Sequence, residues 1–397
     1  MSTDTRRIAA IVLVALAVRL ALAAALGGGF HFADETSYVD AARRLWAGEG
    51  FGAGYNRVPG YPVLLALLGG PGQPVLWLRL AQGILAAAGA GLTFVLADRI
   101  AGRTAALGAA AVYALDPLMA FSAGLLYPEA TAAVILAAAA LAAVESVRRD
   151  SRAWAALAGA LLGALALFRP VALVLAPVAA AWVAPRRVSR AAAVLLAWLL
   201  VLAPWTYRNY QLRGRIVPVS TTGTQAAGIS SSELDQQGVA EALGAQARSQ
   251  PGRLAGRIVR EFGHFWELFP QRLRTDDPAA REALHGVNPR LPTSPLAPPG
   301  IRNVVAAVAS AGEFVLAVVG LVVLWRRRRR EAVLLAGMIL MFALGHSLFV
   351  GRIRYRITVL PLVFVFAGAG IARLVAGRWS PPRERDAART MPATKSS

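Results

Sequence analysis

The sequence predicts an all-α polytopic membrane protein of about ten transmembrane helices, with interfacial helices in its first outer loop and a small extracytoplasmic cap. The first observation is hydropathy, since 56% of the 397 residues are hydrophobic and the mean hydropathy is +0.52. An ordinary soluble protein is less apolar than this. The second is that charged residues make up only 16% of the chain and cluster between long apolar runs. A membrane-spanning helix needs about 20 apolar residues, and the runs have about that length.

Ten apolar runs are predicted to span the membrane. The first follows Arg6 and Arg7, which is also typical of a cleaved signal peptide. The arginine Arg19 inside this run, and the many runs that follow, favour an uncleaved first span. Arg19 itself is expected to be a buried partner of a carboxylate or a carbonyl group. The ten runs are Ile8–Leu26, Pro74–Ala97, Thr104–Leu126, Pro128–Val147, Ala153–Phe168, Pro170–Ala184, Ala191–Trp205, Val304–Trp325, Ala332–Val350 and Ile357–Val375.

The basic residues predict the orientation of these spans. The formal net charge is +20 and Lys395 is the only lysine. In a soluble protein this charge would indicate nucleic-acid binding, but here most arginines lie in short loops between spans, so no nucleic-acid partner is expected. Placing the arginine-rich loops inside puts both termini in the cytoplasm of a plasma-membrane protein. The chain has no cysteine, which excludes disulfides and thiolate metal sites.

Composition divides the chain into four parts. Residues 1–205 form an N-terminal transmembrane module that includes an outer loop at 30–73. Residues 206–300 are the one long polar stretch and are expected to form an extracytoplasmic cap. Residues 301–376 hold the last spans, and 377–397, rich in Pro, Arg and Ser, is expected to be a disordered cytoplasmic tail.

The first outer loop holds the strongest candidate site. It opens with Asp34 and Glu35, continues as an amphipathic stretch that is predicted to be an interfacial helix, and ends with Arg57 before two prolines. Asp34 also has the position and residue type of a helix cap. Two adjacent acids among so few favour a catalytic role for Asp34, with Glu35 and Glu129 as further catalytic candidates. Glu129 either faces Asp34 across the outer mouth of the bundle or only complements a helix N-terminus.

Several arginines lie on the side that the positive-inside pattern disfavours, next to the ends of spans. This placement indicates an anionic ligand such as a phosphate, although scattered arginines also contact lipid headgroups. Three tyrosines and one histidine near these span ends complete the expected substrate-binding set. The whole set is Tyr38, Arg57, Tyr61, Arg169, Arg208, His346, Arg352, Arg354, Tyr355 and Arg356.

Short motifs along the membrane part carry a family resemblance. They are DETSY (34–38), GEGF (48–51), RVPGYP (57–62), LLYPE (125–129), FRP (168–170), PWTYRNY (204–210) and RYRITVLP (354–361). Together they resemble the lipid-phosphate-sugar glycosyltransferases of the protein O-mannosyltransferase and aminoarabinose-transferase superfamily, which have the GT-C membrane fold. The resemblance implies that Asp34 is the catalytic base and that Arg57 contacts the donor phosphate. Ser37 stands where the aminoarabinose transferases carry an arginine, so the resemblance does not extend to their sugar or their lipid A acceptor.

The expected function is therefore inverting transfer of a sugar on the extracytoplasmic face. A polyprenyl-phosphate-linked sugar is the expected donor, and the acceptor is a hydroxyl group of a protein, glycolipid or polysaccharide. The donor is already activated, so no nucleotide site is required. No cofactor is predicted with certainty, and a divalent metal is possible although no paired-acid motif with histidines is present. The alternative is a transporter or flippase of an anionic lipid or solute, which would place charged residues near the bilayer midplane and show an internal repeat. A third reading is a subunit without activity.

Overall fold

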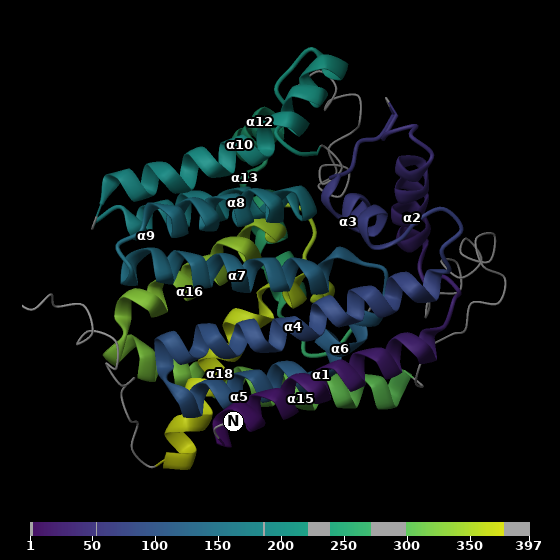
Figure 1. Cartoon of the computed structure of the whole chain (residues 1–397). Helices are drawn as coiled ribbons and strands as arrows, with labels where there is room; N and C mark the ends of the chain where they lie inside the picture. The colour runs from purple at the N-terminus through teal and green to yellow at the C-terminus, as the bar shows by residue number, and fades with distance from the viewer. Residues whose placement is uncertain (1–2, 53, 186, 221–238, 271–298, 377–397) are drawn as a thin grey trace, which may run out of the picture.

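The computed structural model describes residues 3–52, 54–185, 187–220, 239–270 and 299–376, and these residues form helices and no strand. The all-α prediction is therefore confirmed. The long helices run side by side as a bundle (Figure 1). The membrane-length helices are α1 (Thr3–Leu26), α4 (Val75–Ala101), α7 (Pro128–Arg148), α10 (Val188–Arg213), α15 (Pro299–Arg327), α16 (Arg329–Ser347) and α18 (Leu360–Ala376) with the short helix before it.

The helix α18 lies at the centre of this bundle. It packs against α5 (Arg103–Leu115) and α15, while α8 (Arg152–Phe168) lies between α7 and α10. In the most apolar window of Ile353–Val375, 83% of the residues are buried, against 17% in the window of the first span. The first span and α15 therefore turn most of their apolar surface outward, as helices that face lipid do.

Glycines bring α18 close to its neighbours. A Cβ atom added at Gly368 would collide with the carbonyl oxygen of Ala105, and one added at Gly320 would collide with that of Phe366. Without a hydrophobic driving force between helices in lipid, packing of small residues is a main source of helix association. These two glycines therefore allow α18 to contact α5 and α15 at backbone distance.

Ten spans are predicted, and each of the ten runs is helical. Within the described residues, seven helices are long and apolar enough to cross a membrane. The pair α5 and α6 (Pro117–Gly124), bent by 51° at their junction, is apolar and long enough to count as an eighth when taken as one broken span. The other two runs are the shorter apolar helices Arg152–Phe168 and Pro170–Val183.

The bend between α5 and α6 has two polar supports. The Asp116 carboxylate accepts a hydrogen bond from the backbone N–H of Met119 at 2.7 Å, so it caps α6. Arg19 donates to the carbonyl oxygens of Tyr113 at 2.9 Å and Ala114 at 3.2 Å, in the last turn of α5. The expected carbonyl partner of Arg19 is confirmed, and its role is to satisfy a helix C-terminus inside the bundle.

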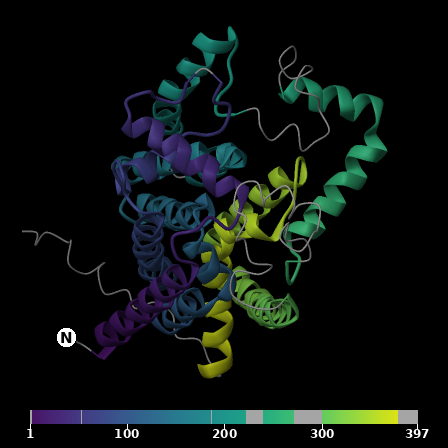
Figure 2. The same ribbon diagram turned by 90° about the vertical axis from the view of Figure 1, so that its right-hand side faces the viewer.

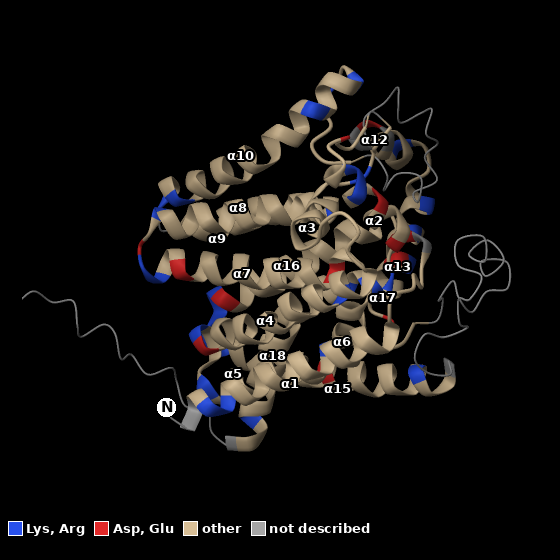
Figure 3. Cartoon of the chain, turned by 45° about the vertical axis from the view of Figure 1, so that its right-hand side comes forward, with Lys and Arg blue, Asp and Glu red and all other residues tan. Residues whose placement is uncertain are grey.

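Charged residues gather mostly at the two ends of the bundle (Figure 3). One end carries α2 (Ala33–Trp46), α12 (Val239–Ser249), α13 (Pro251–Phe265) and α17 (Ile353–Arg356). The first turn of α1 and the last turn of α18 lie at the opposite end (Figure 1). Seen from the first end, α12 and α13 form an arm at the side of the bundle (Figure 2).

Two of the predicted parts lie partly or wholly outside the described residues. The helix α10 continues past Trp205 to Arg213, so the first residues assigned to the cap extend a span. The described residues of the cap after 220 are 239–270 and 299–300, and the predicted tail at 377–397 lies outside the described residues.

The two ends of the bundle are expected to face opposite sides of the membrane. Because the chain contains no cysteine, single substitutions Ser249→Cys on α12 and Ser189→Cys on α10 can be labelled without background. Both side chains lie on exposed positions. An impermeant thiol reagent applied to right-side-out cells is expected to label the first variant and spare the second until the membrane is permeabilised. Labelling of both from one side would contradict the predicted topology.

Candidate active site

Asp34 lies in the first turn of α2, where the chain leaves α1 and turns across the end of the bundle. Its neighbours explain why the helix begins there. Glu35 accepts hydrogen bonds from the backbone N–H groups of His31 at 2.6 Å and Phe32 at 3.1 Å, which satisfies two free donors at the helix start. Phe32 is the N-cap residue, so the interpretation of Asp34 as the helix cap is wrong and Glu35 serves this end instead.

Glu35 points into the bundle. Its Oε1 accepts from Arg79 of α4 at 2.8 Å and from the backbone N–H of Leu126 at 2.8 Å. Arg79 also donates to the carbonyl oxygens of Gly27 at 3.1 Å and Gly124 at 2.7 Å. Both charged side chains are 0% exposed. This ion pair ties the start of α2 to α4 and to the segment before α7, and it leaves Glu35 without a free oxygen for catalysis.

Asp34 points the other way and meets two arginines. Its Oδ1 lies 3.3 Å from Nη1 of Arg57, and its Oδ2 lies 3.2 Å from both terminal nitrogens of Arg354. Burial by itself raises the pKa of Asp34, but the charges of Arg354 and Arg57 outweigh it and bring the pKa below its ordinary value. The carboxylate is therefore ionised at neutral pH, as a general base must be.

Glu129 joins the same cluster from the first turn of α7. Its side chain is 1% exposed and is paired with Arg169, and its Oε1 lies 3.6 Å from Nε of Arg354. Arg354 thus contacts both Asp34 and Glu129. The structure therefore brings Glu129 and Asp34 together around one arginine, as expected if Glu129 faces Asp34 across the mouth of the bundle. Glu129 also lies in the first turn of α7, where a carboxylate complements the helix dipole.

The cluster as a whole keeps an excess of positive charge. The cluster contains three guanidinium groups, those of Arg57, Arg169 and Arg354, and two carboxylates, those of Asp34 and Glu129. Oriented guanidinium groups at the end of a bundle are suited to an oxyanion with several acceptor atoms, such as a phosphate.

Aromatic rings hold these arginines in place. Arg354 lies over the ring of Tyr127 at 4.9 Å and donates to the hydroxyl oxygen of Tyr355 at 3.2 Å. Arg169 lies over the ring of Tyr355 at 4.9 Å, and Arg57 lies over that of Tyr38 at 5.7 Å. Such contacts stabilise a cation and limit its side-chain freedom. Tyr38 and Tyr355 are therefore part of the cluster.

Two other predicted residues support the cluster from behind. His346 stacks on Tyr355 with ring centroids 4.4 Å apart and planes at 15°. Tyr61 is fully buried, donates to Gln82 and packs edge-on against Tyr38 at 5.1 Å. His346 and Tyr61 therefore support Tyr355 and Tyr38, the tyrosines that contact the arginines, rather than contacting Asp34 themselves.

The remaining predicted arginines lie elsewhere. Arg208 donates to the carbonyl oxygen of Gly52 and lies 4.4 Å from the ring centroid of Trp205. Arg356 is buried and donates to Ser310 at 2.8 Å, away from Asp34, and Arg352 is exposed. The short helix α17 directs its successive side chains to different sides, so Arg354 is the one arginine of this loop that reaches the cluster in the described part of the chain.

Two residues with a clear role were not predicted. Arg79 lies in the apolar run Pro74–Ala97, and an arginine inside such a run is itself a signal of a buried function. Tyr127 is part of the LLYPE motif, but its contact with Arg354 depends on a residue far along the chain.

The cluster does not fit a divalent cation. Both carboxylates are already faced by guanidinium groups, which would repel a metal ion placed between them. Among the described residues, no three His, Cys, Asp or Glu side chains come together as a possible metal site.

Comparison with known proteins identifies the fold. No protein-family model and no curated protein matches the sequence. The oligosaccharyltransferase of Archaeoglobus fulgidus in the apo form matches with a TM-score of 0.58 at 13% identity, over 93% of this chain and 50% of that chain. The archaeal oligosaccharyltransferase AglB from the same organism, in complex with an inhibitory peptide and a dolichol-phosphate, matches with a TM-score of 0.56 at 13% identity, over the same shares.

A third structure is ArnT from Cupriavidus metallidurans bound to undecaprenyl phosphate. It matches with a TM-score of 0.53 at 15% identity, over 93% of this chain and 60% of that chain. The present chain thus spans about half to three fifths of the length of these proteins. The likeness at this identity is one of architecture, and it agrees with the fold that the sequence motifs imply. The chain has the GT-C-type membrane fold.

Proposed function

We propose that the protein transfers a sugar from a polyprenyl-phosphate donor to an acceptor hydroxyl group, with inversion, on the extracytoplasmic face of the membrane. The observation that carries the proposal is the contact of Arg354 with Asp34 and Glu129. It puts an ionised carboxylate beside guanidinium groups suited to a phosphate. The lipid phosphates named in two of the matching structures support this class of donor.

In this reaction Asp34 is the general base. It takes the proton of the acceptor hydroxyl while the acceptor oxygen bonds to the anomeric carbon. The bond between that carbon and the phosphate oxygen breaks, and the electron pair leaves with the phosphate. Arg57, Arg169 and Arg354 stabilise the negative charge that develops there. One displacement at one carbon inverts its configuration.

The resting ion pairs suggest how the base becomes active. In the described structure Arg57 and Arg354 hold the pKa of Asp34 low, which also makes it a weak proton acceptor. A donor phosphate competes for the same two guanidinium groups. When they turn to the phosphate, the carboxylate loses stabilisation of its ionised form and its proton affinity rises. Donor binding would thereby prepare the base.

Transfer of labelled sugar from polyprenyl phosphate by the purified chain in detergent tests the proposal. The donor is supplied with total envelope lipids, glycans or proteins as acceptors, and the product is followed by mass spectrometry. Formation of a glycosylated product, with release of polyprenyl phosphate, is the expected result. Movement of an intact lipid or solute across proteoliposomes, without any such product, would favour the transporter alternative.

The arginines are expected to carry donor affinity. Loss of a charge-assisted contact to phosphate costs on the order of 1.5–3 kcal/mol, so Arg57→Ala and Arg354→Ala should each weaken binding of a polyprenyl-phosphate sugar by at least about tenfold. Arg352→Ala is the matched control, because this neighbour of Arg354 is exposed. Equal donor affinity in all three variants, each shown to be folded by a thermal melt, would place the phosphate elsewhere.

A further inference from the structure

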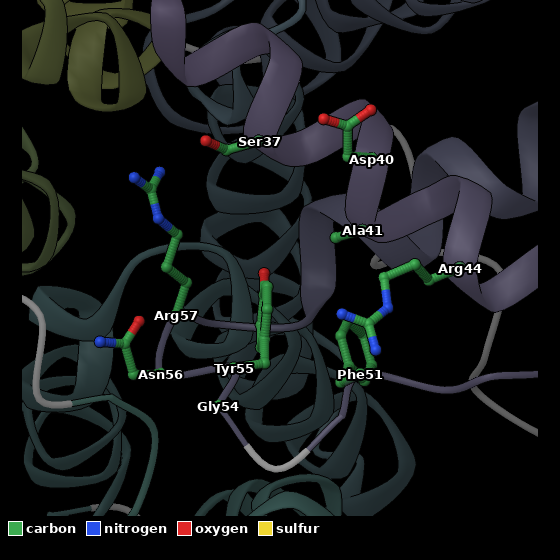
Figure 4. A pocket seen from close by; sticks show the side chains of 9 residues that line it. All are labelled: Ser37, Asp40, Ala41, Arg44, Phe51, Gly54, Tyr55, Asn56 and Arg57. Atoms are coloured by element: carbon green, nitrogen blue, oxygen red, sulfur yellow. The ribbon is translucent and has the colours of Figure 1, made fainter.

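A pocket of about 220 Å³ lies between α2 and the loop residues 51 and 54–57 (Figure 4). It adjoins the cluster around Asp34. Arg57 lines the pocket and also pairs with Asp34, and Ser37, on its α2 wall, lies about one helical turn after Asp34. A ligand in the pocket would therefore have one edge close to the proposed base.

One part of the lining is aromatic. The rings of Phe51 and Tyr55 lie 4.8 Å apart, and Trp205 of α10 packs edge-on against both, at 5.1 Å and 6.2 Å. Tyr55 is held further by its hydroxyl group, which donates to the carbonyl oxygen of Val58 at 3.0 Å. The pocket thus has a fixed apolar surface to which the C–H groups of a small ring can pack.

The other part offers hydrogen-bonding groups of both kinds. Asp40 and Ser37 project from α2 on one side of the hollow, and Arg57 approaches from the loop (Figure 4). Asp40 is paired with Arg43 of its own helix, but its side chain is 62% exposed and that of Arg43 is 53% exposed. An exposed ion pair of this kind is weak, so the carboxylate is able to accept hydrogen bonds from a ligand. Arg44, the other arginine of the lining, is paired with Glu49 at 3.3 Å. Carboxylate, hydroxyl and guanidinium groups together suit a ligand rich in hydroxyl groups.

We propose that this pocket binds one monosaccharide ring, an inference that rests on the proposed sugar transfer. The volume is below the roughly 300 Å³ at which sites for larger ligands begin, so it suits a single ring. An aromatic surface combined with hydroxyl partners matches the two faces of a sugar. The ring belongs either to the donor, whose phosphate would lie on Arg57, or to a carbohydrate acceptor that presents its hydroxyl to Asp34.

Saturation-transfer NMR on the full chain in detergent tests the pocket with methyl glycosides of common hexoses and pentoses as probes. At least one glycoside is expected to receive saturation from the parent protein. Phe51→Leu removes one ring of the aromatic surface and Asp40→Asn removes the carboxylate. Each should weaken binding about fivefold, the worth of roughly one hydrogen bond or stacking contact. Tyr207→Leu, at a position 64% exposed on α10, and Glu241→Gln on exposed α12 are the matched controls and should bind like the parent.

Lipid binding separates the two sources of the sugar. If the pocket variants bind polyprenyl phosphate normally and its sugar-bearing form weakly, the ring is that of the donor. If both lipids bind normally and the KM for a carbohydrate acceptor rises, the ring is that of the acceptor. The proposal is overturned if no glycoside binds the parent, or if the pocket variants bind like the controls.

The same experiment is independent of catalysis by Asp34. Asp34→Asn should retain glycoside binding even though transfer is lost. If the parent binds a glycoside and Asp34→Asn transfers sugar at the parental rate, Asp34 is not the base but the sugar pocket is supported. If the parent binds no glycoside but Asp34→Asn still loses transfer, the sugar pocket is ruled out and Asp34 remains the proposed base.

Discussion

Asp34→Asn is expected to reduce the rate of sugar transfer by about 10²-fold or more while the protein still folds. The amide keeps the shape of the side chain but cannot take a proton from the acceptor. The measurement is transfer of labelled sugar from polyprenyl phosphate in detergent, beside a thermal melt of each variant. Asp40→Asn, in the same helix and on an exposed side chain, is the control for the base function, since its proposed contribution is to sugar affinity and so to KM.

The difference in stability between the parent and Asp34→Asn should depend on pH in a defined direction. The pKa of Asp34 in the folded protein is lowered from its ordinary 3.8, so its ion pairs stabilise the fold fully above about pH 4 and lose this effect as the pH falls through the lower, folded value. The parent and the variant should therefore approach each other in melting temperature at acid pH. Because a third of the side chain is exposed, the difference at neutral pH should be small.

One result would rule out Asp34 as the catalytic base. A variant that melts like the parent and transfers at the parental rate would show that Asp34 serves only to pair Arg57 and Arg354. Glu129, which contacts Arg354 from the other side, would then be the next candidate for the base.

Glu35→Ala is expected to have the largest effect on stability of any single change near the site. It leaves Arg79 buried inside the bundle with its charge unpaired, and removal of one partner of a buried ion pair typically costs about 3–5 kcal/mol. It also leaves the N–H groups of His31, Phe32 and Leu126 without their acceptor. A thermal melt in detergent should show a large decrease in the melting temperature.

The double variant Glu35→Leu with Arg79→Met provides the control. Replacing both charges with apolar side chains removes the unpaired charge, so part of the stability should return. Asp40→Ala, which breaks an exposed pair in the same helix, should melt nearly like the parent. A melting temperature of Glu35→Ala equal to that of the parent would contradict a stabilising role for the buried pair of Glu35 and Arg79. From the sequence, Glu35→Gln is expected to reduce transfer less than Asp34→Asn, because helical geometry turns the neighbouring side chain away. In the structure that side chain turns into the bundle, to Arg79.

Local pattern was enough to predict the all-α class, the apolar runs and the position of α2. Hydropathy is summed over a window of neighbouring residues, and each run of about 20 apolar residues has one stable form in lipid, the helix. The pairing of Asp34 with Arg57 could also be predicted, because both residues belong to the first outer loop. The motif resemblance indicated the same two residues.

The other half of the site depends on helices that are distant in sequence. Arg354 follows Asp34 by 320 positions, and its neighbours Arg352 and Arg356 have the same residue type but point elsewhere. Nothing in the local sequence separates these three, because their directions differ only by rotation about one short helix. The packing of α17 against its neighbours selects Arg354.

The difference between Asp34 and Glu35 has the same physical origin. Two adjacent carboxylates in a helix project about 100° apart, so one faces the open end of the bundle and the other faces its interior. The local sequence is enough to place a pair of acids at the start of an interfacial helix beside the first span. Which acid is buried with Arg79 and which meets Arg57 and Arg354 depends on helix packing, because Arg79 comes from α4 and Arg354 from α17.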